Sequence, residues 1–178
     1  MHKFNIPTKK EVSSTNREIF DDLEKELGFV PNLLATYAYS NNALKNYIEF
    51  TNTPSSLKAK EKEAISLAVS QVNNSDYCLA THTTLAKMYG FNNYQILELR
   101  QGKASFDSKL NTLVALAKNI TEKRGNTNPI VLKNFFNSGW TRENLIDLIS
   151  HIGDKTITNY VNNTVKIPID FPLAPPLY

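Results

Sequence analysis

The stretch from Glu63 to His82, which reads EAISLAVSQVNNSDYCLATH, predicts the centre of the fold. No charged residue occurs between positions 64 and 75. A helix that is apolar around most of its circumference is normally buried. The sequence Asn73-Asn74-Ser75 then indicates a turn, because Asn and Ser favour turns and helix caps. We therefore expect two buried helices that are joined at this turn.

The second of these helices carries the sole cysteine of the chain, Cys78, with His82 four residues later. Residues four apart lie on the same face of a helix, so the thiol and the imidazole should be neighbours. If Ser75 is the N-cap, Cys78 lies in the first turn, where the helix dipole favours a negative charge. A thiol reacts as its thiolate, and its pKa falls near a helix N-terminus or an imidazolium. His82 can then take the proton, and Glu63 can orient and charge-balance the imidazole.

The same residues also have a purely structural interpretation. A single buried cysteine is commonly a small hydrophobic residue, and a histidine on an apolar face is commonly a hydrogen-bonded core residue. On a helical wheel Glu63 lies at the edge of the apolar arc beside Leu67, and several charged residues precede it between positions 58 and 62. Wheel geometry alone therefore favours a solvated carboxylate, and the residues by themselves leave both interpretations open.

The spacing of four residues resembles a known motif. Glu63, Ser75, Cys78 and His82 form E-x11-S-x2-C-x3-H. This pattern is similar to the E-x11-C-x2-C-x3-H signature of the carboxymuconolactone decarboxylase family, in its alkyl hydroperoxidase D-like (AhpD-like) branch. The surrounding sequence resembles the setting of that motif at residues 57–72 and 76–90, upstream at 28–33 and downstream at 159–160.

The resemblance implies a role for each motif residue. Cys78 corresponds to the retained redox thiol, and His82 and Glu63 correspond to its proton relay. Ser75 occupies the position of the family's first cysteine, and a serine cannot form the disulfide through which two-cysteine members cycle. Tyr77 stands where some members have a second histidine. The sequence does not distinguish a natural loss of the first cysteine from an engineered change.

The resemblance also implies a fold and a function. It implies a compact all-α fold with the motif helices at the centre, and homo-oligomers built from trimers. It implies an antioxidant thiol-dependent (alkyl hydro)peroxidase or disulfide-redox enzyme, whose partners are a small-molecule hydroperoxide and a thiol or lipoyl-type electron donor. Two alternatives remain open. One is a decarboxylase-type lyase in which Glu63 and His82 act on a lactone-type acid, and the other is a non-catalytic binding or scaffold protein.

Composition predicts the broad class of the protein. The 178 residues are 41% hydrophobic and 21% charged, which is ordinary for one globular domain spanning residues 1–178. The net charge of +3 is mild, and no dense basic patch alternates with aromatic residues, so we expect no nucleic-acid partner. A single cysteine excludes an internal disulfide and fits the reducing cytoplasm. The first twelve residues lack the apolar segment of a secretory signal.

No apolar run approaches the roughly 20 residues of a membrane span, so we expect a soluble cytoplasmic protein without a membrane partner. The three histidines and one cysteine have no zinc-like spacing, and the glycines form no phosphate-binding loop. We therefore expect neither a metal nor a cofactor. His151, in the last predicted helix, is interpreted as structural.

Hydrophobic spacing predicts an all-α fold of about seven to eight helices, and no strand alternation persists. The candidate segments are 15–27, 31–39, 42–53, the two motif helices between Pro54-Ser55-Ser56 and Gly90, then 93–101, 108–124, 129–137 and 142–164. Pro54-Ser55-Ser56 is expected to cap the helix that holds Glu63. Residues 1–14 are expected to form a solvent-exposed arm. The proline-rich residues 165–178 are expected to form an extended arm that packs on the same subunit or on a neighbour.

Overall fold

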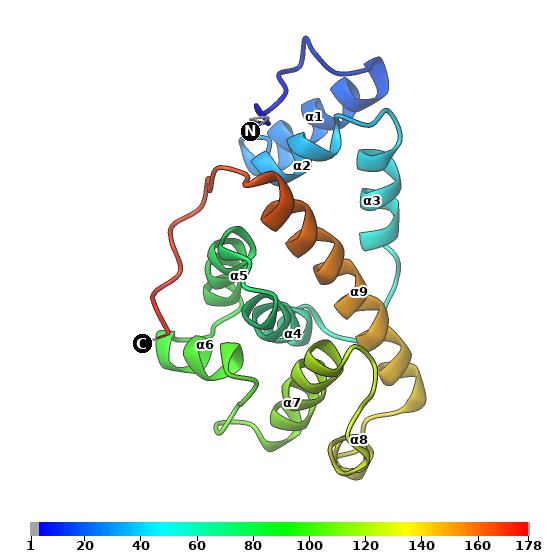
Figure 1. Cartoon of the computed structure of the whole chain (residues 1–178), viewed down its shortest axis with the longest axis vertical. Coiled ribbons are helices and arrows are strands. Elements are labelled where there is room, and N and C mark those ends of the chain that lie inside the picture. Colours follow the sequence, from blue (N-terminus) through cyan, green and yellow to red (C-terminus); the bar gives the residue numbers. More distant parts are fainter. Residues whose placement is uncertain (1–3, 178) are drawn as a thin grey trace.

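The computed structural model describes residues 4–177, which form nine α-helices and no strand (Figure 1). The helices are α1 (Ser14–Leu27), α2 (Asn32–Tyr37), α3 (Ala43–Thr51), α4 (Ala59–Val72), α5 (Asp76–Met88), α6 (Asn93–Arg100), α7 (Ser108–Lys123), α8 (Pro129–Asn137) and α9 (Arg142–Val165). The all-α prediction is confirmed for this part of the chain. Eight of these helices have at least seven residues, in line with the expected seven to eight, and the ninth is the six-residue α2.

Helix α4 lies at the middle of the molecule, in contact with α5, α6, α7 and α9 (Figure 1). Every residue from Ala64 to Ser70 is buried. The absence of charge in this part of the sequence follows from these surroundings, because an unpaired charge is costly in a protein interior. Most of the main hydrophobic core surrounds α4, and it extends over α6, α7 and the N-terminal half of α9. The motif helices therefore form the centre of the fold.

The start of α4 differs from the prediction. The backbone N–H of Lys58 donates a hydrogen bond to the carboxylate of Glu61, at 2.7 Å. Pro54-Ser55-Ser56 does not cap the helix. Instead, the Ser56 hydroxyl donates to Asp147 of α9, at 2.7 Å. The predicted cap is wrong because these serines pair with a carboxylate that is distant in sequence, which local propensity does not reveal.

The predicted break at residues 73–75 is the turn between α4 and α5. Asn74 has a positive φ of 51°, a conformation that asparagine tolerates better than most residues. The N–H of Ser75 donates to the carbonyl of Ser70 at 3.0 Å, and the N–H of Asn74 donates to that of Gln71 at 3.2 Å. This is the hydrogen-bond pattern of a Schellman motif. The turn satisfies the last carbonyls of α4 and starts α5 directly afterwards.

Side-chain hydrogen bonds of four asparagines join this turn region to α9. They run from Asn162 Nδ2 to Ser75 Oγ (3.1 Å), from Asn159 Nδ2 to Ser70 Oγ (3.1 Å), from Asn73 Nδ2 to Asn159 Oδ1 (2.9 Å) and from Asn163 Nδ2 to the Asn73 carbonyl (2.7 Å). We call Asn73, Asn159, Asn162 and Asn163 the asparagine cluster. Asn159 and Asn162 are buried, and buried polar groups need partners. The cluster therefore fixes the register of α9 against the two motif helices.

The N-terminal arm is described from residue 4, and residues 1–3 lie outside the described chain. It contains no helix before Ser14, but Pro7 and Val12 are buried. The hydroxyl of Tyr39 donates to the carbonyl of Asn5 at 2.5 Å. The segment is thus only partly the solvent-exposed arm that the sequence predicts, because Pro7 and Val12 are buried whereas Phe4, Asn5 and Thr8 are exposed.

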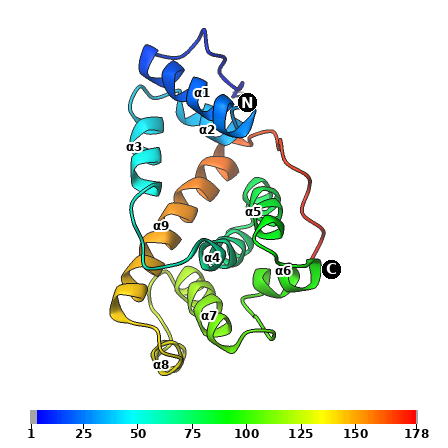
Figure 2. The same ribbon diagram turned by 180° about the vertical axis from the view of Figure 1, so that it is seen from behind.

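The C-terminal arm, residues 166–177, packs on its own chain and runs from the end of α9 past α5 to α6 (Figure 2). The carboxylate of Asp170 accepts a hydrogen bond from the N–H of Asn32, at 2.6 Å, at the start of α2. Arg100 of α6 donates to the carbonyl of Pro175, at 2.5 Å. The arm thus links the start of α2 to α6. Within residues 4–177, no helix combines the length and the apolar composition needed to cross a bilayer.

Candidate active site

The start of α5 places the thiol as the spacing predicts. Ser75 is the N-cap residue and Cys78 is the third residue of the helix. Ser75 does not cap through its side chain, however, because its hydroxyl accepts the hydrogen bond from Asn162. Its side chain is fully buried. The position of the family's first cysteine is therefore a buried contact between α5 and α9.

Glu63 and His82 meet across the α4–α5 pair. His82 Nδ1 lies 2.8 Å from Glu63 Oε2, and the two side chains are only 10% and 12% exposed. A carboxylate only accepts hydrogen bonds, so Nδ1 carries the hydrogen and Nε2 is the nitrogen left for chemistry. Glu63 therefore points inward. A helical wheel of α4 alone favours a solvated carboxylate, but α5 covers the edge of the apolar arc where Glu63 lies.

The surroundings of Glu63 keep it ionised. Burial alone would raise the pKa of its carboxyl group, since burial disfavours the charged form. The positive charge of His82, its hydrogen bond and the charge of Lys155 outweigh this effect, and the pKa of Glu63 lies below its usual value of 4.5. An ionised Glu63 can hold the imidazole in one orientation and stabilise the imidazolium that forms when His82 takes a proton.

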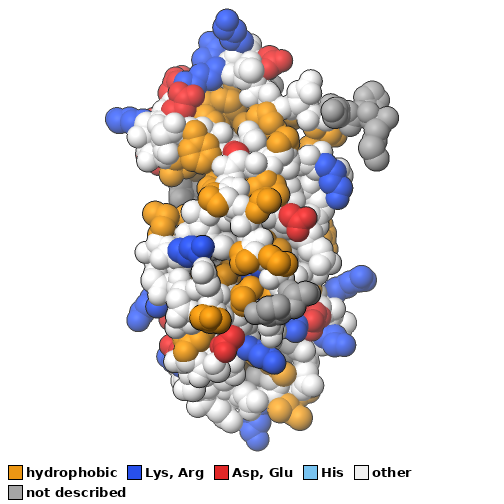
Figure 3. Space-filling model, turned by 90° about the vertical axis from the view of Figure 1, so that its left-hand side faces the viewer, with side chains coloured by type: hydrophobic (Ala, Val, Ile, Leu, Met, Phe, Trp, Pro, Cys, Tyr) orange, Lys and Arg blue, Asp and Glu red, His pale blue; other side chains and the backbone are white. Residues whose placement is uncertain are grey.

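A cavity of about 520 Å³ lies against Cys78 and His82. Its walls are mainly apolar and come from α1, α2, α5 and the loop between the first two of these helices; they include Leu27, Phe29, Leu33, Leu34, Leu85 and Met88. Phe171 of the C-terminal arm completes the wall. Figure 3 shows hydrophobic side chains gathered on the side of the molecule that carries this arm. Cys78 itself is only 2% exposed, so a reagent reaches the thiol through the cavity.

Two further polar residues line this cavity although no motif in the sequence singles them out, Tyr47 of α3 and Lys155 of α9. Lys155 is 8% exposed and forms an ion pair with Asp154, at 3.0 Å. A signal for Lys155 exists in the sequence. It lies three residues after the buried Ile152 and four before the buried Asn159, which is the spacing of one helix face. A lysine on the buried face of a helix is uncommon, because its ammonium group needs a charged or polar partner.

Tyr37 and Tyr47 stack at 4.6 Å between ring centroids, and the Tyr47 hydroxyl donates to Asp154 Oδ1 at 2.8 Å. Burial and the negative charge of Asp154 raise the pKa of both tyrosines. Both hydroxyls therefore remain protonated at neutral pH. Tyr47 holds Asp154 in place as a hydrogen-bond donor.

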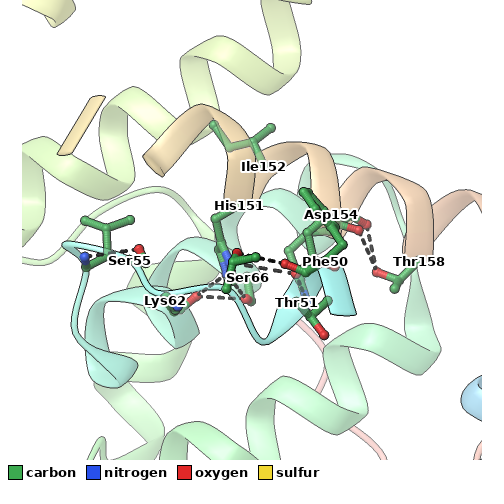
Figure 4. Close-up of polar contacts among 12 residues, drawn as sticks. Phe50, Thr51, Ser55, Lys62, Ser66, His151, Ile152, Asp154 and Thr158 are labelled. Carbon is green, nitrogen blue, oxygen red and sulfur yellow. Dashed lines mark hydrogen bonds and ion pairs between the residues drawn. The ribbon is translucent and has the colours of Figure 1, made fainter. Parts of the chain in front are cut away.

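A second polar cluster lies on the other side of Asp154, next to His151 (Figure 4). His151 Nε2 lies 2.9 Å from Ser66 Oγ and 3.1 Å from the carbonyl of Lys62, and the Ser66 hydroxyl donates to the same carbonyl. A carbonyl only accepts, so Nε2 carries the hydrogen and cannot act as a base toward Ser66. Ser66 is also fully buried. This serine, histidine and aspartate set is therefore structural, in agreement with the interpretation of His151 as structural.

The electrostatics of His151 support the same conclusion. Burial and the positive charge of Lys155 lower the pKa of His151 to about 4, against the opposing influence of Asp154. His151 is therefore neutral at physiological pH. Within residues 4–177, no three His, Cys, Asp or Glu side chains are placed to hold a metal ion.

Known proteins resemble this chain in sequence and in fold. The model of the carboxymuconolactone decarboxylase family matches residues 36–119, which contain both motif helices. The resemblance to this family is therefore confirmed. Among curated proteins, none matches the sequence.

Solved structures with low sequence identity share the fold. A peroxidase-related protein with an alkylhydroperoxidase AhpD core, from Ralstonia eutropha JMP134, has a TM-score of 0.84 at 18% identity, over 94% of this chain and 92% of that chain. A peroxidase-related protein from Silicibacter sp. TM1040 has a TM-score of 0.81 at 21% identity, over 93% and 90%. The debrominase Bmp8, solved in complex with 2,3,4-tribromopyrrole, has a TM-score of 0.77 at 15% identity, over 96% and 93%. The fold of this chain is thus AhpD-like.

The lowered pKa of His151 predicts a pH dependence of stability. The folded value of about 4 lies below the ordinary 6.5, so the unfolded chain binds more protons between these values. This contribution to stability is present above pH 6.5 and is lost as the pH falls toward 4. The variant His151→Gln keeps a side-chain N–H donor but does not titrate. The free energy of unfolding of wild type relative to this variant should decrease by about 1–2 kcal/mol between pH 7 and pH 5. Urea unfolding at both pH values measures it, and an unchanged difference contradicts the prediction.

Proposed function

We propose that the protein is a thiol-dependent peroxidase that acts on alkyl hydroperoxides through Cys78. The observation that carries this proposal is the combination of a thiol in the first turn of α5 with an imidazole held by a carboxylate, both beside one apolar cavity. A helix N-terminus and a neighbouring imidazolium favour the thiolate. The apolar walls suit the organic part of an alkyl hydroperoxide. The family match and the peroxidase-related fold neighbours support this class of function.

The reaction needs no group outside the protein and its substrate. The Cys78 proton passes to Nε2 of His82, and the resulting imidazolium is stabilised by Glu63. The thiolate sulfur attacks the terminal oxygen of the hydroperoxide, so an S–O bond forms as the O–O bond breaks. The leaving alkoxide takes the proton from His82, which yields an alcohol and a sulfenic acid on Cys78.

The single cysteine determines how the sulfenic acid is reduced. With Ser75 at the partner position, the chain has no second thiol to close an internal disulfide. An external thiol or a lipoyl-type dithiol condenses with the sulfenic acid and releases water, and a second thiol equivalent then restores Cys78. This dependence on a donor fits the reducing cytoplasm, where we place the protein.

A lyase is the second candidate, because the Glu63–His82 pair is complete without the cysteine and the matching family is named after a decarboxylase. In that case the pair performs acid–base chemistry on a lactone-type acid, and activity survives Cys78→Ala but not His82→Ala. A protein that only binds or scaffolds requires neither residue for its function. The behaviour of these two variants thus separates the three functions.

We also propose that the chain forms homo-oligomers, built from trimers, through α9. Exposed Ile146, Ile149, Ile157 and Tyr160 lie at spacings of three to four residues around Gly153. They form one narrow stripe opposite the buried face of α9. A Cβ atom at Gly153 would meet no atom within 4 Å, which leaves room for the close approach of another helix.

The thiol mechanism predicts rapid formation of a sulfenic acid that depends on His82. Treatment with cumene hydroperoxide in the presence of dimedone should label Cys78 in wild type. In His82→Ala the rate should fall by at least about tenfold, because general acid–base catalysis contributes about 10²–10⁴. Intact mass spectrometry at timed intervals measures the labelling. His151→Gln is the matched histidine control and should react at the wild-type rate; an equal rate in His82→Ala would falsify the relay.

The position of Ser75 predicts the effect of restoring a second thiol. Residues at the N-cap and at the third helical position lie one turn apart, within the usual Cα–Cα span of a disulfide. Ser75→Cys should therefore form a reversible disulfide with Cys78 on peroxide treatment and lose two hydrogens in mass. Ser75→Ala, which also removes the bond to Asn162, is the control. If the Cys variant stops at the sulfenic acid, the correspondence with two-cysteine members is wrong.

The stripe on α9 predicts the effect of a charge on assembly. Ile149→Glu should lower the molar mass in light scattering from that of an oligomer to that of one chain, because a buried unpaired carboxylate is costly at an interface. Ile130→Glu is the control, since Ile130 is an exposed isoleucine on α8, outside the stripe. A monomeric wild type, or the same loss of mass in both variants, contradicts the proposal.

A further inference from the structure

Lys155 is the least expected residue in the cavity beside Cys78. Its side chain is only 10% exposed, and it contributes to the wall that also contains Cys78 and His82. Transfer of an ammonium group from water into an apolar surrounding is unfavourable unless the charge has partners. The partners of Lys155 therefore indicate what the cavity is built to hold.

The partners of Lys155 within the protein are incomplete. Its Nζ lies 3.0 Å from Asp154 Oδ2, but no hydrogen bond with good geometry involves this Nζ in residues 4–177. Asp154 is shared, because its Oδ1 accepts from Tyr47 and its Oδ2 lies 3.8 Å from Nδ1 of His151. A lysine ammonium has three N–H donors. Lys155 thus keeps donors that can bind an occupant of the cavity.

Apart from Asp154, no charged group in residues 4–177 forms an ion pair with Lys155, although its charge also lowers the pKa of Glu63. Glu26 is exposed on α1, at the rim. His82 is paired with Glu63. The remaining walls are mainly apolar, and the most exposed of them, Leu27 and Met88, lie toward solvent. The cavity therefore combines a buried cation beside the thiol with apolar walls that continue to the surface.

We propose that Lys155 binds the anionic group of an amphiphilic substrate, an alkyl chain that carries a carboxylate. The carboxylate forms charge-assisted hydrogen bonds with the ammonium, and the chain extends along the apolar wall toward Leu27 and Met88. The cavity volume of about 520 Å³ lies in the range of small-molecule sites. Insofar as it names the substrate class, a hydroperoxide of a medium-chain carboxylic acid, this inference rests on the proposed peroxidase function.

Binding of the anion is tested first without peroxide chemistry. Decanoate and decanol have chains of equal length and differ in the head group, and each is used to protect Cys78 of the intact protein from alkylation by iodoacetamide. Decanoate should protect wild type at a concentration at least about tenfold lower than decanol, since one added charge-assisted contact corresponds to a factor of this order. Equal protection by the two compounds in wild type overturns the proposal without the need for any variant.

Two variants then assign the preference to Lys155. In Lys155→Met, decanoate and decanol should protect Cys78 from alkylation equally well. In Lys155→Arg, which keeps the charge next to Asp154, decanoate should still protect at the lower concentration. Lys133→Met removes an exposed lysine of α8 and is the control for net charge, with the wild-type preference expected. If Lys155→Met does not fold, as judged by its thermal transition, Lys155→Arg and wild type still decide. A preference that persists in a folded Lys155→Met variant overturns the assignment.

The substrate class is tested with 3-hydroperoxydecanoate and its methyl ester, in which the hydroperoxide lies close to the head group that Lys155 binds. Wild type should form the Cys78 sulfenic acid faster with the acid than with the ester, and Lys155→Met should not discriminate. If the protein prefers decanoate but forms no sulfenic acid, the result supports the anion site and contradicts the peroxidase function. If both compounds oxidise Cys78 at equal rates, the result supports the peroxidase function and contradicts the anion site. The two failures are therefore distinguishable.

Discussion

The contact between the turn at residues 73–75 and α9 determines the geometry of the whole site. The asparagine cluster holds the two together, and it does so through buried amide groups that have few alternative partners. Cys78 follows the turn by one helical turn, so its position depends on where the turn lies. Lys155 lies two turns before Asn162 on the same face of α9. One set of hydrogen bonds therefore places the thiol and the ammonium relative to each other.

Two histidines show how the surroundings decide a role. His82 donates from Nδ1 to a carboxylate and keeps its second nitrogen beside a cavity. His151 donates from Nε2 to a backbone carbonyl, and burial and the charge of Lys155 hold its pKa near 4. A carboxylate partner stabilises an imidazolium, whereas a carbonyl partner and a nearby cation favour the neutral ring. The same side chain thus suits proton transfer at one position and packing at the other.

The sequence predicts those features that depend on neighbours along the chain. The helix limits follow from capping residues such as Gly28 and Thr141, and the pairing of Cys78 with His82 on one face follows from their spacing. The inward position of Glu63 does not follow from its own helix, because it depends on how α5 covers α4. Tyr47 and Lys155 reach the cavity from α3 and α9, and no local periodicity brings these segments together. Of these two residues, only Lys155 is indicated by the sequence, because it shares the spacing of the buried residues of α9.

The order in which a ribosome makes the chain has a consequence for the cavity. The motif helices are synthesised well before α9 and the C-terminal arm, whereas a domain generally folds as a unit. Until Lys155, Asp170 and Phe171 emerge, the cavity lacks its cation and one of its walls, and the start of α2 lacks its carboxylate partner. A nascent chain that lacks α9 therefore contains both Glu63 and His82, but it lacks the contact that fixes the motif turn and the walls that close the pocket. The residues that would bind the substrate are thus synthesised after the residues that would react with it.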